Sequence, residues 1–354
     1  MTPHDHPFAP PAASSQGKGC LWAVIIMLVV MLGFAGLIIL GLAADKMHDD
    51  GEELRPGPGK FQKKTVDDID GGGDGDGDLL LIDVEGVISN QRDDSPFIQR
   101  EGMSDQIVKQ IRAAQDDKDV KGLLLALNTP GGGVTPSDEI HHAIEEYKDK
   151  THKPVVAHMA DVCASGGVYV AVAADEIIAS PTTITGSIGV IMGTLNFHEL
   201  MEKYGVKGVT VKSGARKDLL SPTKPVNEED LKVIQELIDS MYGRFVALVA
   251  KGRNLDEGQV RAFADGSVFT AERAQELKLV DGVGYRAEAL ERLRELAKAK
   301  KSRLVRYKKK PSSPFEALFT DMRMPSSESV ADRLAERVGL GPAGNAGAYY
   351  LWRP

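Results

Sequence analysis

The 354-residue chain contains little cysteine and no excess of positive charge. Its two cysteines, Cys20 and Cys163, provide no disulfide framework, because one lies at the edge of an apolar segment and the other well inside the polar part of the chain. The formal net charge of −8 argues against a nucleic-acid partner, since nothing in the overall composition neutralises phosphates. Apolar residues at 42% and charged residues at 27% are instead typical of a globular protein.

Two segments match a known ligand-binding motif only in part. The turn "NTPGGG" at 128–133 lacks the Gly-Lys-Ser/Thr that a nucleotide-binding P-loop needs. The aspartates of "DGDGD" at 74–78 match the first three ligands of a calcium-binding EF-hand loop, but Leu79 stands where that loop requires glycine. The sequence therefore predicts no metal and no cofactor, and residues 45–78 are expected to be a flexible acidic linker.

One long apolar run precedes this linker. Residues 21–44 are 24 residues without a charge, enough at 1.5 Å each to span a hydrocarbon core of about 30 Å with some tilt. We predict a transmembrane anchor at 20–44, because the run is too long for the alternative, a cleaved signal peptide, and only Lys18 precedes it as a basic residue. The Pro-, His- and Ser-rich residues 1–19 are expected to be disordered, and the flanking basic residues do not decide the orientation.

From Leu79 onward, short apolar runs typical of strands alternate with helical patterns. Strands are expected at 79–88, 122–128, 154–160 and 176–180. Helices are expected at about 104–115, from an N-cap at Thr135, after Ser165, and from an N-cap at Asn227 to about Gly252. This alternation indicates an α/β core with largely parallel strands, in one domain at 79–310. The tail at 311–354 is expected to be looser, and the basic run "YKKKPSSP" at its start to be solvated or to contact anionic lipid headgroups.

Four turns rich in glycine or serine fall where predicted strands end. They are "NTPGGG" (128–133), "CASGG" (163–167), "TGSIG" (185–189) and "KSGARKD" (212–218). In open α/β folds, sites assemble at strand ends, and consecutive glycines can bring backbone N–H groups close to a ligand, as an oxyanion hole requires. Ser165 in the second turn is a candidate nucleophile, although that stretch alone is equally typical of a strand-to-helix turn.

A serine nucleophile needs a base, and histidine is the first candidate type. His141 and His142 are expected at the surface, because the apolar stripe of their predicted helix excludes both. His158 can point into the site from its strand, but no His–Asp pattern stands out. Cys163 is expected to be a small packed side chain, since no base accompanies it.

Lysine is the other candidate type. An ordinary lysine with a pKa near 10.4 is only about one part in a few thousand neutral at pH 7, so a lysine base must be buried to lower its pKa. Lys217 follows a glycine-containing turn, and Lys212 and Lys224 are equally eligible. Spacing alone favours a solvated surface position for Lys217.

Taken together and in order, five motifs resemble one known family. "NTPGGGVTPSDEI", "ASGGVYVA", "TGSIGV", "KSGARKDLLSP" and "GSVFTAERAQELKLVDGVG" are closely similar to the signal peptide peptidase A family of membrane serine proteases. The resemblance covers about residues 79–300, and the common order of five motifs makes it specific. It implies a Clp-protease/crotonase-like α/β fold, preceded by a single N-terminal transmembrane helix, and a Ser–Lys dyad.

The resemblance also implies a role for individual residues. Ser165, in A-S-G-G, would be the nucleophile, and Lys217, in G-x-x-K, the general base. Ser187 of "TGSIG" would hydrogen-bond to the lysine and orient it. The backbone N–H groups of Gly132 and Gly166 would form the oxyanion hole, while the second glycine after the serine, at position 167, would let the substrate backbone approach.

The implied function is a membrane endopeptidase that cleaves peptides such as signal-peptide remnants on the extracytoplasmic side. Compact members of the family form homo-oligomeric rings, in which the serine and lysine of one site can come from neighbouring protomers. Two alternatives are a crotonase-type acyl-CoA enzyme, against which the anchor argues, and a non-enzymatic membrane scaffold, against which the intact set of Ser165, Lys217 and Ser187 argues. The long Pro/His-rich N-terminus, the "DGDGD" linker and the extended tail ending "AYYLWRP" depart from the family pattern and leave regulation and substrate range open.

Overall fold

The computed structural model describes residues 25–33, 55–66, 75–95, 98–310 and 349–351. The chain divides into two units, Met1–Glu53 and Leu54–Pro354. In the first unit, residues 25–33 form a helix whose side chains are all exposed. Among the described residues, none of the helices has the length and apolar character needed to cross a membrane. The predicted disordered tail at 1–19 and most of the predicted anchor at 20–44 lie outside the described residues.

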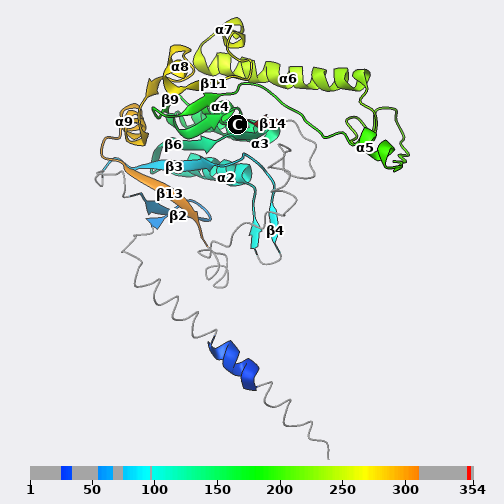
Figure 1. Cartoon of the computed structure of the whole chain (residues 1–354). Helices are drawn as coiled ribbons and strands as arrows, with labels where there is room; N and C mark the ends of the chain where they lie inside the picture. Colours follow the sequence, from blue (N-terminus) through cyan, green and yellow to red (C-terminus); the bar gives the residue numbers. More distant parts are fainter. Residues whose placement is uncertain (1–24, 34–54, 67–74, 96–97, 311–348, 352–354) are drawn as a thin grey trace, which may run out of the picture. The chain divides into compact units, whose positions relative to one another are not determined.

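A mostly parallel sheet forms the core of the second unit (Figure 1). Its central strands are β3 (Asp78–Glu85), β6 (Val120–Thr129), β8 (Val155–Ala164) and β10 (Ile184–Gly186), each parallel to the next. The strand order is β1-β2-β13-β3-β6-β8-β10-β11, and β9 also pairs with β8 and β12 with β9. Antiparallel pairs occur toward the two edges, at β1–β2–β13 and at β10–β11. The predicted α/β core with largely parallel strands is confirmed.

The remaining elements are short strands and the helices around the sheet. The strands are β1 (Arg55–Pro56), β2 (Phe61–Thr65), β4 (Asp93–Ser95), β5 (Ile98–Arg100), β7 (Gly131–Gly133), β9 (Glu176–Ala179), β11 (Val268–Thr270), β12 (Gly282–Val283), β13 (Arg303–Lys309) and β14 (Tyr349–Leu351). The helices are α2 (Met103–Asp116), α3 (Val134–Thr151), α4 (Gly166–Ala171), α5 (His198–Lys203), α6 (Glu228–Arg253), α7 (Glu257–Arg261), α8 (Ala271–Glu276) and α9 (Arg286–Leu296).

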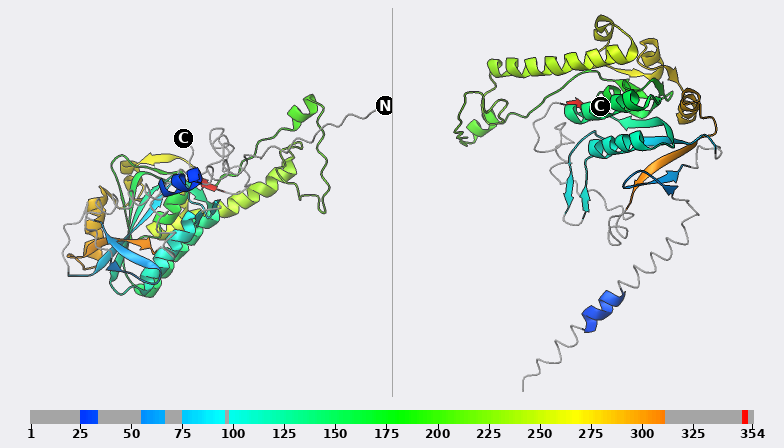
Figure 2. Two further views of the ribbon diagram at one scale, coloured as in Figure 1. Left: turned by 90° about the horizontal axis from the view of Figure 1, so that it is seen from below. Right: turned by 180° about the vertical axis from the view of Figure 1, so that it is seen from behind.

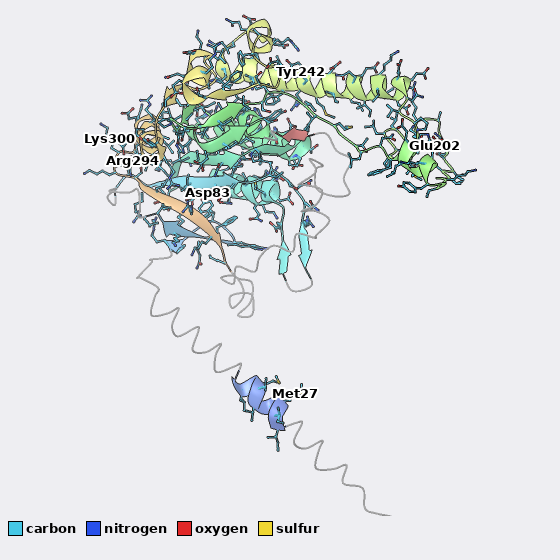
Figure 3. The ribbon with its side chains drawn as sticks, in the orientation of Figure 1. Met27, Asp83, Glu202, Tyr242, Arg294 and Lys300 are labelled. Carbon is cyan, nitrogen blue, oxygen red and sulfur yellow. The ribbon has the colours of Figure 1, made fainter. Side chains whose placement is uncertain are left out.

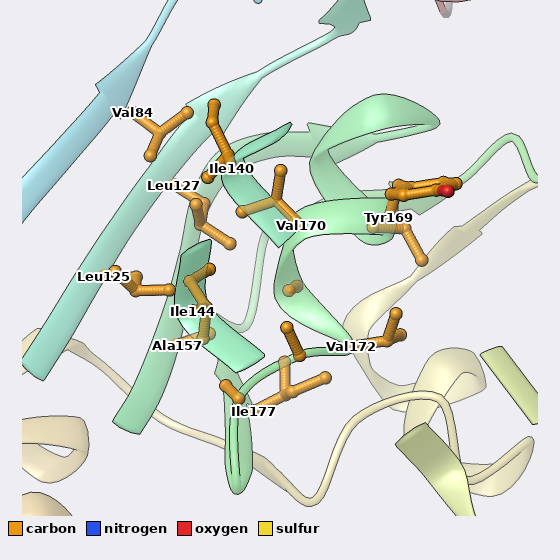
Figure 4. Packing of buried hydrophobic residues seen from close by; sticks show 14 of the residues in the cluster. Val84, Leu125, Leu127, Ile140, Ile144, Ala157, Tyr169, Val170, Val172 and Ile177 are labelled. Carbon is orange, nitrogen blue, oxygen red and sulfur yellow. The ribbon is translucent and has the colours of Figure 1, made fainter. Parts of the chain in front are cut away.

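The two faces of the sheet are covered differently. Alternate residues of β3, β6 and β8, such as Val84, Leu125 and Ala157, pack against α2, α3 and α4 on one face (Figure 4). The opposite face packs against α9 through residues such as Leu124 and Leu290. Because α4 follows β8 directly and packs into the larger cluster, the turn between them is held from both sides.

Two predicted helix starts can be compared with the structure. Asn227 caps α6 as predicted, since its side chain accepts a hydrogen bond from the Glu229 N–H, and α6 ends at Arg253. The predicted cap at Thr135 is wrong: α3 begins at Val134, with Gly133 at the N-cap. The reason is that β7 runs directly into α3, so the glycine strand itself supplies the extended residue before the helix.

Part of the segment predicted to be a flexible linker belongs to the sheet. Residues 61–65 form β2, which pairs antiparallel with β13. Lys63 on β2 is 2% exposed and donates hydrogen bonds to Asp78 and Asp117, both buried, at 3.0 Å each. The polar composition of this segment therefore reflects a buried ion-pair cluster rather than solvation along its whole length.

An arm extends from the second unit between β10 and the body of α6. Figures 1 and 2 show α5 beyond the N-terminal end of α6, away from the sheet. Only the C-terminal part of α6 is anchored in the large core, through Phe245, Val246, Val249 and Ala250. We call residues 190–227 the arm. It carries Lys217.

Candidate active site

Ser165 stands at the turn where β8 ends and α4 begins. It is 1% exposed and has a φ of +54°, in the left-handed region that a residue with a side chain seldom adopts. Its N–H donates to the Gly186 carbonyl at 2.8 Å, and its carbonyl accepts from the Tyr169 N–H at 3.0 Å. Although Ser165 occupies the N-cap position, its side chain makes no capping hydrogen bond. The fold therefore fixes the backbone of Ser165 and leaves its hydroxyl uncommitted to the helix.

Two glycines lie beside this serine. Gly166 is the first residue of α4, where N–H groups have no partner within the helix. A Cβ added to Gly166 would lie 3.1 Å from the Gly132 nitrogen and 2.6 Å from Ser137 Oγ. The structure thus brings Gly132 and Gly166 together next to Ser165, at a distance that a side chain would obstruct. This is the arrangement in which two backbone N–H groups can converge on one oxygen.

The glycine strand β7 has one edge occupied by a neighbouring segment. On that edge Ile88 donates to the Gly131 carbonyl at 2.8 Å and accepts from the Gly133 N–H at 2.9 Å. Since N–H groups of successive strand residues point to opposite sides, the Gly132 N–H points to the other edge. Ser137, which sequence reasoning missed, also holds β7, because its hydroxyl donates to the Gly133 carbonyl at 2.9 Å.

The other edge of β7 pairs with the C-terminal strand β14. The pairing is antiparallel, with Tyr350 opposite Gly132 and Leu351 opposite Gly131. This edge of β7 therefore accepts an extended segment of chain beside Ser165. Nothing in the sequence motifs indicated that residues 349–351, in the predicted looser tail, would form this strand.

Ser187 lies at the end of the strand next to β8. Gly186 pairs with Ala164 in the parallel register of β10 and β8, so Ser187 and Ser165 follow paired residues. Ser187 is 9% exposed, has a φ of +52°, and donates its N–H to the Ser267 carbonyl at 2.6 Å. Ser165 and Ser187 are therefore brought together by the sheet.

Lys217 is not brought to Ser165 within one chain. It is an exposed residue of the arm, near the N-terminal end of α6. Lys224 ties this part of the arm to the first turn of α6 through a 2.6 Å hydrogen bond to Asp230. From that turn to Phe245, whose ring lies 5.0 Å from Tyr169 of α4, the helix rises about 25 Å. In Figure 3 the labelled Glu202 on α5 lies beyond the N-terminal end of α6, and the labelled Tyr242 lies on the part of α6 nearer the sheet.

The two alternative lysines are engaged with carboxylates of the arm. Lys212 donates to Asp218 at 2.7 Å, and Lys224 contacts the same carboxylate at 3.3 Å in addition to Asp230. The hydrogen bond to Asp230 raises the pKa of Lys224, which is opposite to the change that a general base needs. Within the described residues, Lys217 has no carboxylate at ion-pair distance. Lys212 and Lys224 thus hold residues 212–224 of the arm together and join them to the start of α6.

The histidines do not supply the missing base. The expected surface position of His141 is wrong: it is 6% exposed, and its ring lies 5.5 Å from that of Tyr169 on α4. Burial lowers the pKa of His141 to about 4. His158 faces a different cavity, lined also by Asp83 and Ser180, and its Nε2 lies 3.1 Å from Ser180 Oγ. His142 is exposed, as expected.

Two further expectations concern small residues near Ser165. Cys163 is buried, as predicted for a packed side chain, and burial raises the pKa of its thiol. The expectation that Gly167 admits the substrate backbone is wrong. A Cβ at Gly167 would lie 2.8 Å from Thr129 Cγ2 and 3.0 Å from Cys163 Sγ, so this glycine is required by packing inside the domain.

Comparison with known proteins places this arrangement in a family. The family model of peptidase family S49 matches residues 147–300, and a Clp protease model matches residues 97–184. A protein of Enterococcus faecium that carries the name signal peptide peptidase SppA is 40% identical over 230 residues, 65% of this chain and 67% of its own. A Synechocystis protein named as a protease is 38% identical over 211 residues, 60% of this chain and 71% of its own. Protease 4 of Haemophilus influenzae is 35% identical over 221 residues, 62% of this chain and 34% of that longer chain.

These findings identify the class and then the family. The protein is a serine protease with a Clp protease-like α/β fold. More particularly, it belongs to peptidase family S49, the signal peptide peptidase A family. The family membership that the five motifs predicted is confirmed, and the peptidase is favoured over an acyl-CoA enzyme of related fold.

Proposed function

We propose that this protein is a membrane-anchored endopeptidase in which Ser165 of one protomer and Lys217 of a neighbouring protomer form a Ser–Lys dyad. Its substrates are peptides such as signal-peptide remnants, hydrolysed near the membrane on the extracytoplasmic side. The observation that carries the proposal is the strained turn at Ser165, with Gly166 and the Gly132 nitrogen beside it. The anchor is the apolar run at 21–44.

The pairing of β14 supports a binding mode for the substrate. An extended peptide lies antiparallel to β7 in the place of β14, and its backbone forms hydrogen bonds with the edge of the glycine strand that β14 otherwise occupies. The scissile carbonyl then sits beside the Gly132 N–H and within reach of the Ser165 hydroxyl. Such backbone recognition suits peptides of varied sequence, because the glycine strand presents no side chains.

The position of Lys217 supports a dyad between protomers. The arm is too far from Ser165 of its own chain, yet an oligomer can insert it into the site of the next subunit. The arm also exposes apolar side chains that a single chain leaves in water, among them Leu195, Phe197, Leu200, Tyr204, Val206, Val209 and Val211. Val209 and Val211 are 89% and 95% exposed. A cluster of this kind marks a protein–protein interface, here one with a second copy of the chain in a ring.

The chemistry requires this change of environment. In the single chain, Lys217 is exposed and a water-solvated ammonium is a poor base. Burial in the partner's site removes water and favours the neutral amine, which Ser187 orients through its hydroxyl. The amine takes the proton of Ser165 as Oγ attacks the scissile carbonyl, and the N–H groups of Gly132 and Gly166 stabilise the oxyanion. The lysine then protonates the leaving amine, and water hydrolyses the acyl-enzyme.

Substitution of the two dyad residues tests the proposal. Ser165→Ala and Lys217→Ala should each abolish hydrolysis of a fluorogenic peptide, whereas Lys207→Ala, an exposed lysine of the same arm, should retain it. Circular dichroism and gel filtration report whether each variant keeps its fold and its oligomeric state. Substantial activity of folded Ser165→Ala or Lys217→Ala would refute the dyad.

A further inference from the structure

The arm, residues 190–227, continues directly into α6. The contacts that hold α6 against the core therefore set the direction of the arm that carries Lys217. Two ion pairs join α6 to α3. Arg244 Nη2 contacts Asp138 Oδ1 at 2.6 Å, and Lys251 Nζ contacts Glu145 Oε2 at 2.5 Å. From the first pair to the second is seven residues, or about two helical turns, along α3 and equally along α6. The two pairs therefore fix α6 against α3 at two points along its length.

The pair nearer the arm belongs to a larger network. Tyr169 donates its hydroxyl to Asp138 Oδ1 at 2.5 Å, and Arg244 Nε lies 3.0 Å from both Asp138 Oδ1 and the Tyr169 hydroxyl. Hydrogen bonds from Tyr169 and Arg244 outweigh the effect of burial and lower the pKa of Asp138, so the carboxylate is charged at neutral pH. The Tyr169 ring also contacts Phe245 and His141. Helices α3, α4 and α6 thus meet at one hydrogen-bonded point.

This point lies one helical turn from the nucleophile. The Tyr169 N–H donates to the Ser165 carbonyl, so Tyr169 stands above Ser165 in the first turn of α4. On the α3 side, Ser137 precedes Asp138 and touches the space beside Gly166. The network of Asp138, Tyr169 and Arg244 therefore fixes the position of α6 relative to the turn that carries Ser165.

The two ends of the docked part of α6 differ in how firmly they are held. Beyond Lys251, Gly252 lies so close to Val172 that an added Cβ would stand 2.2 Å from its carbonyl oxygen. Arg253 forms two hydrogen bonds to Asp281, at 2.6 and 3.0 Å. Toward the arm, side-chain hydrogen bonds from Arg244 to Asp138 and Tyr169 join α6 to α3 and α4, and Tyr242 donates to the Ala264 carbonyl on another side of the helix.

This difference makes α6 a lever. The two ion pairs are about 10 Å apart, and the start of α6 lies about 24 Å beyond Arg244. A 1 Å shift at Arg244, with the Lys251 end fixed, moves the start of α6 by about 3 Å. A misplacement of about 1 Å in a catalytic group can reduce the rate about 100-fold. A small displacement of Arg244 therefore displaces Lys217 far enough to lower the catalytic rate.

We propose that Asp138, Tyr169 and Arg244 are positioning residues that set the angle of α6 and so deliver Lys217 to Ser165 of the neighbouring protomer. The inference rests on the proposed dyad between protomers. None of the three residues contacts the substrate in this arrangement. Their effect is on kcat, because the β7 edge that binds the peptide is unchanged.

The test compares Arg244→Gln with Lys251→Gln, which removes the matched ion pair at the firmly held end. Tyr169→Phe is the milder second variant, because it removes only the hydroxyl and keeps the ring against Phe245. We expect Arg244→Gln to lower kcat about 10- to 100-fold with KM within about twofold of wild type. Lys251→Gln should change kcat less than about twofold, and Tyr169→Phe should fall between them.

A distance measurement separates positioning from a general loss of structure. Nitroxide labels at Glu202→Cys on α5 and Lys150→Cys on α3 report the arm-to-core distance by pulsed electron resonance in the full chain, with Cys20 replaced by serine and labelled protein diluted into unlabelled protein. Cys163 is buried and takes no label. The distance distribution should broaden or shift in Arg244→Gln and stay as in wild type in Lys251→Gln.

The outcomes distinguish this inference from the dyad itself. The positioning role is overturned if the distance distribution of Arg244→Gln is unchanged, or if it changes but kcat stays like that of Lys251→Gln. In either case an inactive Lys217→Ala leaves the proposed dyad standing. Substantial activity of Lys217→Ala in the same series overturns the dyad whatever the distances show. A broadened distribution together with lower kcat and unchanged KM supports the inference.

Discussion

Adding one methyl group to Gly132 tests the oxyanion hole directly. In Gly132→Ala, the new Cβ would lie 2.0 Å from the Ile88 carbonyl oxygen and 2.6 Å from the Ile88 nitrogen, whereas ordinary contacts begin at 3.4 Å. The obstructing atoms are backbone, so β7 must move away from Ile88 by about 1 Å or more. That movement carries the Gly132 N–H out of its position in the proposed oxyanion hole.

The expected size of the effect follows from the loss of one donor. Removal of a single oxyanion-hole donor costs about 2.7–4 kcal/mol of transition-state stabilisation, or about 10²–10³ in kcat. The strain of the added methyl also lowers the free energy of unfolding by about 1–3 kcal/mol, which shifts the melting temperature of a domain of this size by roughly 2–12 °C. Catalysis is therefore expected to fall far more than stability.

The assay is steady-state hydrolysis of a fluorogenic peptide together with thermal melting. Gly193→Ala is the control, because a Cβ at Gly193 has nothing within 4 Å. The control should match wild type in both measurements. If folded Gly132→Ala retains more than about a third of the wild-type kcat, the Gly132 N–H is not an oxyanion donor and the reasoning fails.

Two further predictions concern the ion-pair cluster and the C-terminal strand. Lys63→Met removes the buried cation that Asp78 and Asp117 share; Asp78 keeps its ion pair with Arg55, but the buried Asp117 loses its cation, so the free energy of unfolding in urea at pH 7 should fall by about 3–5 kcal/mol. Burial acts to raise the pKa of Asp117, but hydrogen bonds from Lys63 and Tyr307 prevail and lower it, so this stabilisation is present above the unfolded pKa of about 4 and is lost as pH falls below it. A wild-type advantage that stays constant down to pH 3 would contradict this account. Deleting residues 349–354 should raise kcat/KM severalfold, because β14 occupies the edge of β7 that the peptide needs, and a synthetic peptide of the deleted sequence should inhibit competitively. Unchanged kcat/KM after the deletion would show that β14 does not compete with substrate.

The sequence predicted the features that neighbouring residues along the chain determine. The Asn227 cap of α6 needs only its own turn, and the alternation of apolar runs from Leu79 onward needs only the pleat of each strand. The five motifs indicated the family because their order is preserved along the chain. Local sequence around Ser165 predicts only a turn, and its role as a nucleophile is a prediction from that resemblance.

The missed features depend on partners far away in sequence. Lys63 reads as a linker residue, yet its carboxylate partners Asp78 and Asp117 come from other strands and loops. His141 falls outside the apolar stripe of α3, yet it is buried, with its ring beside that of Tyr169 on α4. The pairing of β14 with β7 joins segments more than 200 residues apart, and no local pattern specifies it.

Mixing two inactive variants tests the central claim that the dyad forms between protomers. Ser165→Ala and Lys217→Ala are dissociated, combined in equal amounts and reassembled, with each variant alone as control. A site is active only where a protomer with intact Ser165 meets a neighbour with intact Lys217, so random reassembly into rings should restore about a quarter of the wild-type activity. A dyad within one chain would give no activity in the mixture, and that result, in reassembled and folded oligomers, would contradict the account.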